Sequence, residues 1–412
     1  MIIDLPKTST VAVSKKLVAL RNDVGAMTLG RVLTLIIVVE DHEAEEIIEA
    51  ANDASRQHPC RIIVVVAANR RGATRLDAQI RLGGDAGASE IIVMRLYGTL
   101  ASHEQSVVVP LLLADSPVVA WWPREAPVDM RVDPIAQMVQ RRITDAAESR
   151  NPKAMLKRLA DHYQPGDTDL AWTRITRWRG LLAAALDGPP YEVVTEAVVA
   201  GALDSPSSEL LAAWLGVTLK VPVRRVRTAA GTGVVSVRLS RSSGHIDLVR
   251  PDGTIATLSQ PGQPDRRISL KRRGLAECLA DELRRLDDDD TYSRTLTKGL
   301  QTLKTVRLTA SEAAARGQAP STKQARRLAA KLGRSPLSKE AAEMVTAKPP
   351  PDRGDTVAVK KATARKVAGA PTERERVVGR RATTKSARAA VKQAEAEDTA
   401  AKGRRPSRAP GA

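Results

Sequence analysis

The chain has 412 residues and a formal net charge of +18, which by itself would suggest a nucleic-acid-binding protein. The charge is unevenly distributed, because residues 301–412 hold 26 basic and 10 acidic side chains, whereas the first 300 residues hold 39 and 37. The first 300 residues are thus nearly neutral. They are long enough to bury a large core, and their length is typical of about two domains.

Residues 301–412 contain no aromatic side chain and repeat Ala, Lys, Arg, Pro and Thr. The segment has too few large apolar side chains for their burial to offset the conformational entropy lost on folding. We therefore expect a disordered basic tail. Ser321 and Gln324 could form a capping box for a helix at residues 322–332, but an isolated helix of about 12 residues is marginal in water and could require a partner to fold. The excess charge suggests binding of nucleic acid or another polyanion, although a solubilising extension without its own function explains the composition equally well.

The two cysteines, Cys60 and Cys278, stand among apolar residues, the first in a β-rich run and the second on the inner face of an expected helix. Buried free thiols and a reducing cytosol fit this pattern better than a disulfide. No apolar run reaches the roughly 18 residues of a membrane-spanning helix, and the N-terminus lacks the layout of a signal peptide. We therefore expect a soluble, cytoplasmic protein.

Residues 1–150 are predicted to form an α/β domain with a mixed sheet. The continuous β-branched run at residues 32–39 is typical of a strand buried on both faces. A helix capped by Asp41 follows, and residues 62–66 give a second buried strand, so the order is βαβ, which favours a parallel pair. The other predicted elements are a helix at residues 8–21, strands at 75–82, 91–96 and 118–122, and a last strand or helix at 141–145.

A change to helical periodicity near Asn151 marks the predicted start of a second domain, residues 151–300, of the α+β class. Ser205 followed by Pro206 is a favourable helix start, since the hydroxyl caps free amides. The short β runs between residues 223 and 270 fit a helix-backed antiparallel sheet. The other predicted elements are helical spacing at residues 152–186, a strand at 193–199 and closing helices at 274–286 and 290–300.

The usual catalytic and metal-binding signatures are absent from the sequence. The five histidines lack the His-Glu-x-x-His spacing, Cys60 has no second cysteine nearby, and neither a nucleophile elbow nor a phosphate loop occurs. Residues 83–87, Gly-Gly-Asp-Ala-Gly, indicate a turn, because the strand-turn-helix order of a nucleotide fingerprint is missing. The sequence predicts no catalytic residue, no cofactor and no metal.

Two pairs of neighbouring side chains are candidates for partner contact. Trp121 and Trp122 end a predicted strand, so their indoles point to opposite faces and one could anchor an interface; core packing on both faces is the equally weighted alternative. Arg141 and Arg142, with Asp145, could clamp a sugar phosphate or a partner carboxylate. A solvated ion-pair cluster is the favoured explanation of the second group.

A further candidate is the string Gly-Asp-Thr-Asp-Leu-Ala-Trp-Thr-Arg at residues 166–174, whose acids are expected in the first turn of a helix. Local capping explains the acids but leaves Trp172 and Arg174, which suit a protein contact. The predicted partner-contact residues are therefore Trp121, Trp122, Arg141, Arg142, Asp167, Asp169, Trp172 and Arg174.

Five strings carry a resemblance to a known family: residues 166–174, Trp121-Trp122-Pro123, Arg141-Arg142-Ile143-Thr144-Asp145, Ser259-Gln260-Pro261-Gly262-Gln263, and residues 28–32, Thr-Leu-Gly-Arg-Val. Together they resemble the OpcA family of glucose-6-phosphate dehydrogenase assembly proteins, most closely its actinobacterial members. The similarity runs from the N-terminus to about residue 300, in the domain order of the family. The basic tail departs from the family pattern.

The resemblance implies a non-catalytic partner that binds glucose-6-phosphate dehydrogenase and promotes its active oligomer, which feeds NADPH supply through the oxidative pentose phosphate pathway. No catalytic residues come with it. Two alternatives stay open: binding of nucleic acid or an anionic surface through the tail, and, less favoured, a sugar-phosphate enzyme using Arg141, Arg142 and Asp145.

Overall fold

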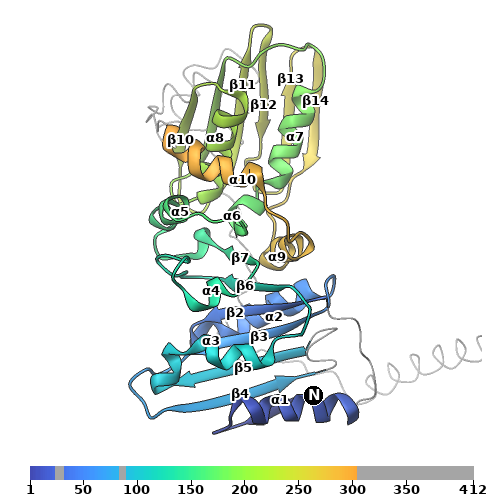
Figure 1. The fold of residues 1–412 in the computed structure, drawn as a ribbon. Coiled ribbons are helices and arrows are strands. Elements are labelled where there is room, and N and C mark those ends of the chain that lie inside the picture. Colours follow the sequence, from blue (N-terminus) through green and yellow to red (C-terminus); the bar gives the residue numbers. More distant parts are fainter. Residues whose placement is uncertain (24–31, 83–89, 304–412) are drawn as a thin grey trace, which may run out of the picture. The chain divides into compact units, whose positions relative to one another are not determined.

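A computed structural model describes residues 1–23, 32–82 and 90–303 (Figure 1). The string at residues 28–31, the turn expected at residues 83–87, and the tail with its predicted helix lie outside the described residues. The described part contains an eight-stranded sheet and a six-stranded sheet, both accompanied by helices. The prediction of a mixed α/β protein is confirmed.

The first sheet has the strand order β1-β4-β5-β3-β2-β6-β7-β8. The six strands from β5 to β8 in this order are parallel to one another. The other two pairs are antiparallel, since β4 runs opposite to β5 and β1 runs opposite to β4. The strands are β1 Ile2–Leu5, β2 Leu33–Val39, β3 Cys60–Ala67, β4 Arg75–Arg81, β5 Glu90–Tyr97, β6 Val118–Trp122, β7 Arg141–Thr144 and β8 Asp167–Asp169.

The central strands form where the sequence predicts them, because their continuous apolar runs are buried on both faces of the sheet. β2 pairs with β3 in parallel from Leu33 opposite Cys60 to Val39 opposite Val66. The helix between them, α2 (Ala44–Ser55), buries Ile47 and Ala51. The predicted βαβ unit is confirmed.

Alternation along the strands divides the core around the first sheet into two layers. Ile36 belongs to the layer that includes α1 (Thr10–Asp23) and α3 (Glu104–Val108). Leu35 belongs to the opposite layer, with α2 and α9 (Leu275–Arg284). Helix α9 comes late in the chain, so the first sheet is covered partly by residues that follow the second sheet. Both cysteines, Cys60 and Cys278, are buried in this layer as thiols and do not form a disulfide, as predicted.

The predicted last element at residues 141–145 is strand β7, but the sheet continues beyond it. After α5 (Pro152–Asp161), the chain adds β8, which pairs in parallel with β7. The acids Asp167 and Asp169 therefore lie in a strand, and the expectation that they stand in the first turn of a helix is wrong. The expected capping is confirmed for Asp169, which caps the short helix α6 (Leu170–Thr173) by accepting from the amide of Ala171. The division near Asn151 thus falls between two strands of one sheet and stays a prediction.

The second sheet has the order β10-β9-β11-β12-β13-β14, and all its pairs are antiparallel except β9 with β10. Helices α7, α8 and α10 lie on one face of this sheet (Figure 1) and share its hydrophobic cluster. The strands are β9 Glu196–Ala202, β10 Val223–Thr228, β11 Val234–Arg241, β12 Gly244–Val249, β13 Ile255–Gln260 and β14 Gln263–Ser269. The remaining helices are α4 Pro134–Gln137, α7 Thr176–Leu186, α8 Pro206–Leu219, α10 Asp290–Arg294 and α11 Leu300–Thr302, with a π-helical segment at Thr295–Gly299 between the last two.

Helix α8 begins as predicted, since the Ser205 hydroxyl accepts a hydrogen bond from the amide of Ser208 at 3.3 Å. The Ser207 hydroxyl donates to the carbonyl oxygen of Ala171 at 2.8 Å, which joins α8 to α6. At this helix start the backbone approaches β9 closely. A Cβ atom at Gly201 would overlap the Ser208 hydroxyl and lie 2.8 Å from the carbonyl oxygen of Gly233.

In the described residues, no helix is long and apolar enough to cross a membrane.

We predict that Gly201→Ala destabilises the protein by about 2 kcal/mol, because the added methyl group forces α8 away from β9. Gly180→Ala is the matched control, since a Cβ there meets nothing within 4 Å and alanine favours the helical conformation of α7. Chemical denaturation of both variants measures the difference. Equal stability of the two variants would contradict the close approach of α8.

Candidate functional site

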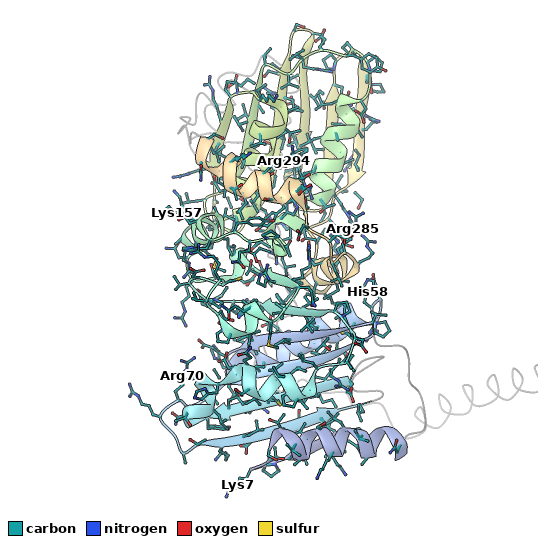
Figure 2. All side chains as sticks on the ribbon, in the orientation of Figure 1. Lys7, His58, Arg70, Lys157, Arg285 and Arg294 are labelled. Atoms are coloured by element: carbon teal, nitrogen blue, oxygen red, sulfur yellow. The ribbon has the colours of Figure 1, made fainter. Side chains whose placement is uncertain are left out.

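The eight residues predicted to contact a partner lie on β6, β7 and β8 and in the α6 region. Trp121, Trp122 and Asp169 are at carboxyl ends of strands, whereas Arg141, Arg142 and Asp167 are at the amino ends of β7 and β8. Arg174 is half-buried, and the side chains of the other seven are buried within this chain. The exposed basic side chains of Lys157, Arg285 and Arg294 extend outward by contrast (Figure 2). The predicted site is therefore a buried polar cluster.

Trp121 and Trp122 are buried on opposite faces of β6. Trp121 packs in the layer that contains α2 and α9, whereas Trp122 belongs to the other hydrophobic cluster. Both indole side chains therefore pack in the core, and neither is an exposed anchor. The sequence could not decide this, because α9 covers Trp121 from a distant part of the chain.

The two neighbouring arginines of β7 bind acceptors inside the chain. Arg142 donates to the carboxylate of Asp167 and the carbonyl oxygen of Pro165, and it lies 3.1 Å from the carbonyl oxygen of Val139. Burial raises the pKa of Asp167, while the Arg142 guanidinium acts in the opposite direction. The Arg142 guanidinium thus connects β7 to β8 and to the loops that precede these two strands.

Arg141 reaches the opposite way, toward α9. Its guanidinium donates to the carboxylate of Glu282 at 2.6 Å and to the carbonyl oxygen of Asp287 at 2.8 Å. The Thr173 hydroxyl donates to the other oxygen of Glu282. The side chains of Arg141 and Glu282 are 4% and 9% exposed, so this is a buried ion pair that joins the first sheet, α6 and α9.

Asp145 and Asp169 follow β7 and end β8, at the same edge of the sheet. Arg174 holds Asp145 through two parallel hydrogen bonds of 2.6 Å. Asp169 accepts from the Thr144 hydroxyl at 2.6 Å and from the amides of Ala146 and Ala171 at 2.9 and 2.8 Å. Burial raises the pKa of Asp169 to about 7, and the neighbouring Asp145 acts in the same direction.

Trp172 of α6 contacts polar groups from α7 and from the start of α10. Its indole N–H donates to Asp289 at 2.8 Å, and Asp289 also caps α10 by accepting from the amide of Tyr292. The guanidinium carbon of Arg179 lies 3.6 Å from the centre of the Trp172 ring. Burial lowers the pKa of Arg179 to about 10, although Asp289 and Glu282 oppose this shift.

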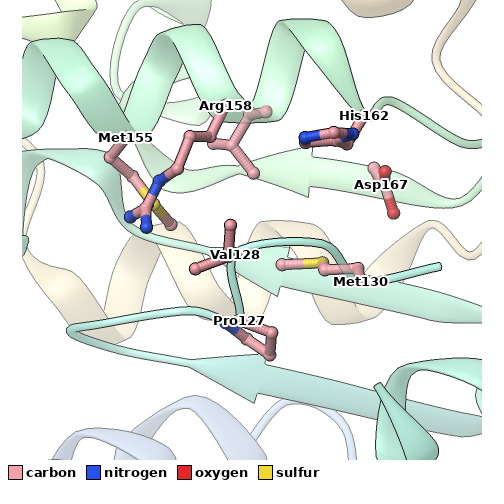
Figure 3. A pocket seen from close by; sticks show the side chains of 8 residues that line it. Pro127, Val128, Met130, Met155, Arg158, His162 and Asp167 are labelled. Carbon is pink, nitrogen blue, oxygen red and sulfur yellow. The ribbon is translucent and has the colours of Figure 1, made fainter. Parts of the chain in front are cut away.

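A small pocket opens beside this cluster (Figure 3), lined by Pro127, Val128, Met130, Met155, Arg158, Leu159, His162 and Asp167. It has room for about one water molecule, so a sugar phosphate would not fit without rearrangement. Among the described residues, no group of three or more His, Cys, Asp or Glu side chains could hold a metal ion.

The most exposed large apolar side chains of the described residues lie elsewhere, before β9. Tyr191 and Val193 are 81% and 82% exposed, whereas Val194 between Val193 and β9 is buried. The segment is held by the Arg241 guanidinium, which donates to the carbonyl oxygen of Pro190 at 2.9 Å, and by the amide of Ser243, which donates to Glu192 at 2.9 Å. Tyr191 and Val193 were not among the predicted contact residues. Val193 was expected to begin a strand, which in the structure begins at Glu196, although the preceding Pro189-Pro190 pair indicates an exposed connection.

We predict that Asp169 makes stability fall as pH rises toward 7. The folded carboxyl titrates near 7 and an unfolded one near 4, so the folded state binds more protons between these values. The free energy of unfolding therefore decreases with rising pH in this interval. Asp169→Asn removes this component, whereas the exposed Asp53→Asn keeps it. Denaturation at pH 5, 6 and 7 measures the slopes, and equal slopes for wild type and Asp169→Asn would refute the assignment.

Comparison with protein families gives two matches in consecutive parts of the chain. Residues 51–161 match the N-terminal domain, and residues 165–296 the C-terminal domain, of a family described as glucose-6-phosphate dehydrogenase subunit. A comparison with curated proteins gave no match.

Among solved structures, the chain is similar to a Gfo/Idh/MocA family oxidoreductase from Vibrio cholerae, with 10% identity over 66% of this chain and 95% of that chain and a TM-score of 0.31. It is also similar to glucose-6-phosphate 1-dehydrogenase from Mycobacterium avium, with 13% identity over 74% and 98% and a TM-score of 0.32. At these TM-scores neither similarity carries an argument about function. The two family matches together span residues 51–296, and the chain therefore belongs to the OpcA family of glucose-6-phosphate dehydrogenase assembly proteins.

Proposed function

We propose that this chain is a non-catalytic partner of glucose-6-phosphate dehydrogenase that binds the enzyme and favours its active oligomer. The observation that carries the proposal is the match of both family domains, in order, along one chain. A partner that binds one oligomeric state more tightly shifts the equilibrium toward that state, and no chemistry by the partner is needed. Higher dehydrogenase activity would support NADPH supply through the oxidative pentose phosphate pathway.

The contacts of the buried cluster support a non-catalytic role. Arg141 and Arg142 were the residues considered for a sugar-phosphate enzyme, and both guanidinium groups donate to carboxylates and carbonyl oxygens of this chain. Asp145, the third member of that group, is held by Arg174. Nothing in the described residues favours the nucleic-acid alternative, because the tail lies outside them.

The first test mixes the purified full chain with its cognate dehydrogenase and measures oligomer mass by light scattering and NADPH formation by absorbance. We expect a larger mass and a higher activity in the mixture than in the dehydrogenase alone, and no NADPH formation by the chain alone. Unchanged mass and activity would reject the proposal.

We further propose that Tyr191 and Val193 contact the dehydrogenase directly. Both are held in a fixed segment, and an exposed tyrosine beside an apolar residue is typical of an interface anchor. Of the eight residues first considered for partner contact, seven are buried, and we propose that they hold the fold rather than touch the partner.

Replacing Tyr191 and Val193 together by alanine is expected to weaken dehydrogenase binding by about tenfold or more, without loss of thermal stability, because neither side chain packs in the core. The matched control replaces Val128 and Val132, which are 67% and 71% exposed near the first sheet. Titration calorimetry measures both affinities. A loss confined to the Val128 and Val132 variant would place the contact on the other surface.

A further inference from the structure

Strand β14 has one edge without a partner strand. It is the last strand in the order of the second sheet, and among the described residues only β13 pairs with it. Every residue from Gln263 to Arg267 is exposed, as is Ser269, while Ile268 is half-buried against the core. An exposed edge offers unpaired N–H and C=O groups to another extended segment.

The register shows which backbone groups are free. The amide of Leu270 donates to the carbonyl oxygen of Thr254 at 2.8 Å, and Ile268 pairs with Ala256 in the same register. Backbone groups of successive residues in a strand point to opposite sides. The N–H and C=O groups of Arg267 and Ser269 therefore face away from β13, on the free side.

The edge also carries positive charge that the sheet does not neutralise. Arg266 and Arg267 are exposed on opposite faces of the strand and form no ion pair among the described residues, and Asp265 is the only acid in β14. By contrast, Arg238 of the same sheet binds Asp247 through two bonds of 2.6 Å. The unpaired guanidinium groups fit carboxylates on both faces of an added strand.

A second copy of this chain fits the edge less well. In the antiparallel register that sets Asp265 opposite Arg267, Arg266 of one copy stands opposite Arg266 of the other, and like charges in that position are destabilising. Proline in an edge strand often prevents pairing with another strand. Pro264, however, lies at the irregular start of the pairing with β13, before the free backbone groups of Arg267 and Ser269. The charge therefore favours an acidic strand over a basic copy.

We propose that the free edge of β14 binds an extended acidic segment of the dehydrogenase, which adds a seventh strand to the second sheet. This inference rests on the proposed function and specifies the chemistry of one contact. Main-chain hydrogen bonds to Arg267 and Ser269 would provide the pairing, and Arg266 and Arg267 would select acidic side chains on the two faces.

Two variants test the two parts of the contact. Arg267→Pro removes an N–H on the free side and leaves the bonds to β13 in place, whereas the double change Arg266→Glu with Arg267→Glu reverses the charge and keeps the backbone. The control reverses Arg70 and Arg71, which are exposed in the connection between β3 and β4. Thermal unfolding checks that each variant is folded. If Arg267→Pro does not fold, the charge-reversal variant still tests the contact.

Affinity for the cognate dehydrogenase is measured for the full-length proteins at low and high salt. We expect about tenfold weaker binding for both β14 variants, unchanged binding for the Arg70 and Arg71 control, and a salt dependence that is smaller after charge reversal. Wild-type affinity in folded β14 variants would overturn this inference alone. Absence of any wild-type complex would overturn the proposed function as well. Sedimentation of the chain by itself completes the test, because self-association that Arg267→Pro abolishes would identify a second copy as the occupant and overturn the proposal.

Discussion

The buried ion pair between Arg141 and Glu282 is the contact on which the described structure depends most. It joins β7 of the first sheet to α9, which the chain reaches only after completing the second sheet. Desolvating two charges is costly, and part of the cost is offset here because the Thr173 hydroxyl donates to Glu282 and the Asp287 carbonyl oxygen accepts from Arg141. Helix α9 then covers the face of the first sheet that holds Trp121. The C-terminal family domain thus completes the core beside the N-terminal one.

This arrangement separates the residues that hold the fold from those available to a partner. The polar cluster around Asp145, Asp169 and Arg174 is satisfied internally, and a buried network of this kind fixes one arrangement of the elements that carry it. A contact surface must instead be formed by groups that reach solvent. The segment before β9 leads into the second sheet, and β14 is the last strand of that sheet. The Arg241 side chain holds the first through the carbonyl oxygen of Pro190, and pairing with β13 holds the second. Such preorganised groups lose little entropy on binding.

Local chemistry made much of the fold predictable. Continuous apolar runs gave β2 and β3, and the Ser205-Pro206 pair gave the start of α8, because these signals depend on neighbouring residues alone. The same reasoning predicted helix capping, which Asp169 provides, but it placed Asp167 and Asp169 in a helical turn. That was wrong, since only the pairing of β8 with β7 makes the segment a strand. The burial of Arg141 was equally hidden, because its partner Glu282 is 141 residues away in the sequence. The candidate residues were thus identified as separate pairs and strings, while their joining into one buried network depended on long-range contacts.

The central claim is that this chain binds the dehydrogenase through exposed groups of the second sheet, over a buried cluster that stays unchanged. A structure of the complex, determined by electron cryo-microscopy with full-length proteins, tests it most directly. The account predicts dehydrogenase density against Tyr191, Val193 and the free edge of β14, with the Arg141 to Glu282 pair intact. Density inserted between β7 and α9, with that ion pair broken and Arg141 bound to the dehydrogenase, would contradict it.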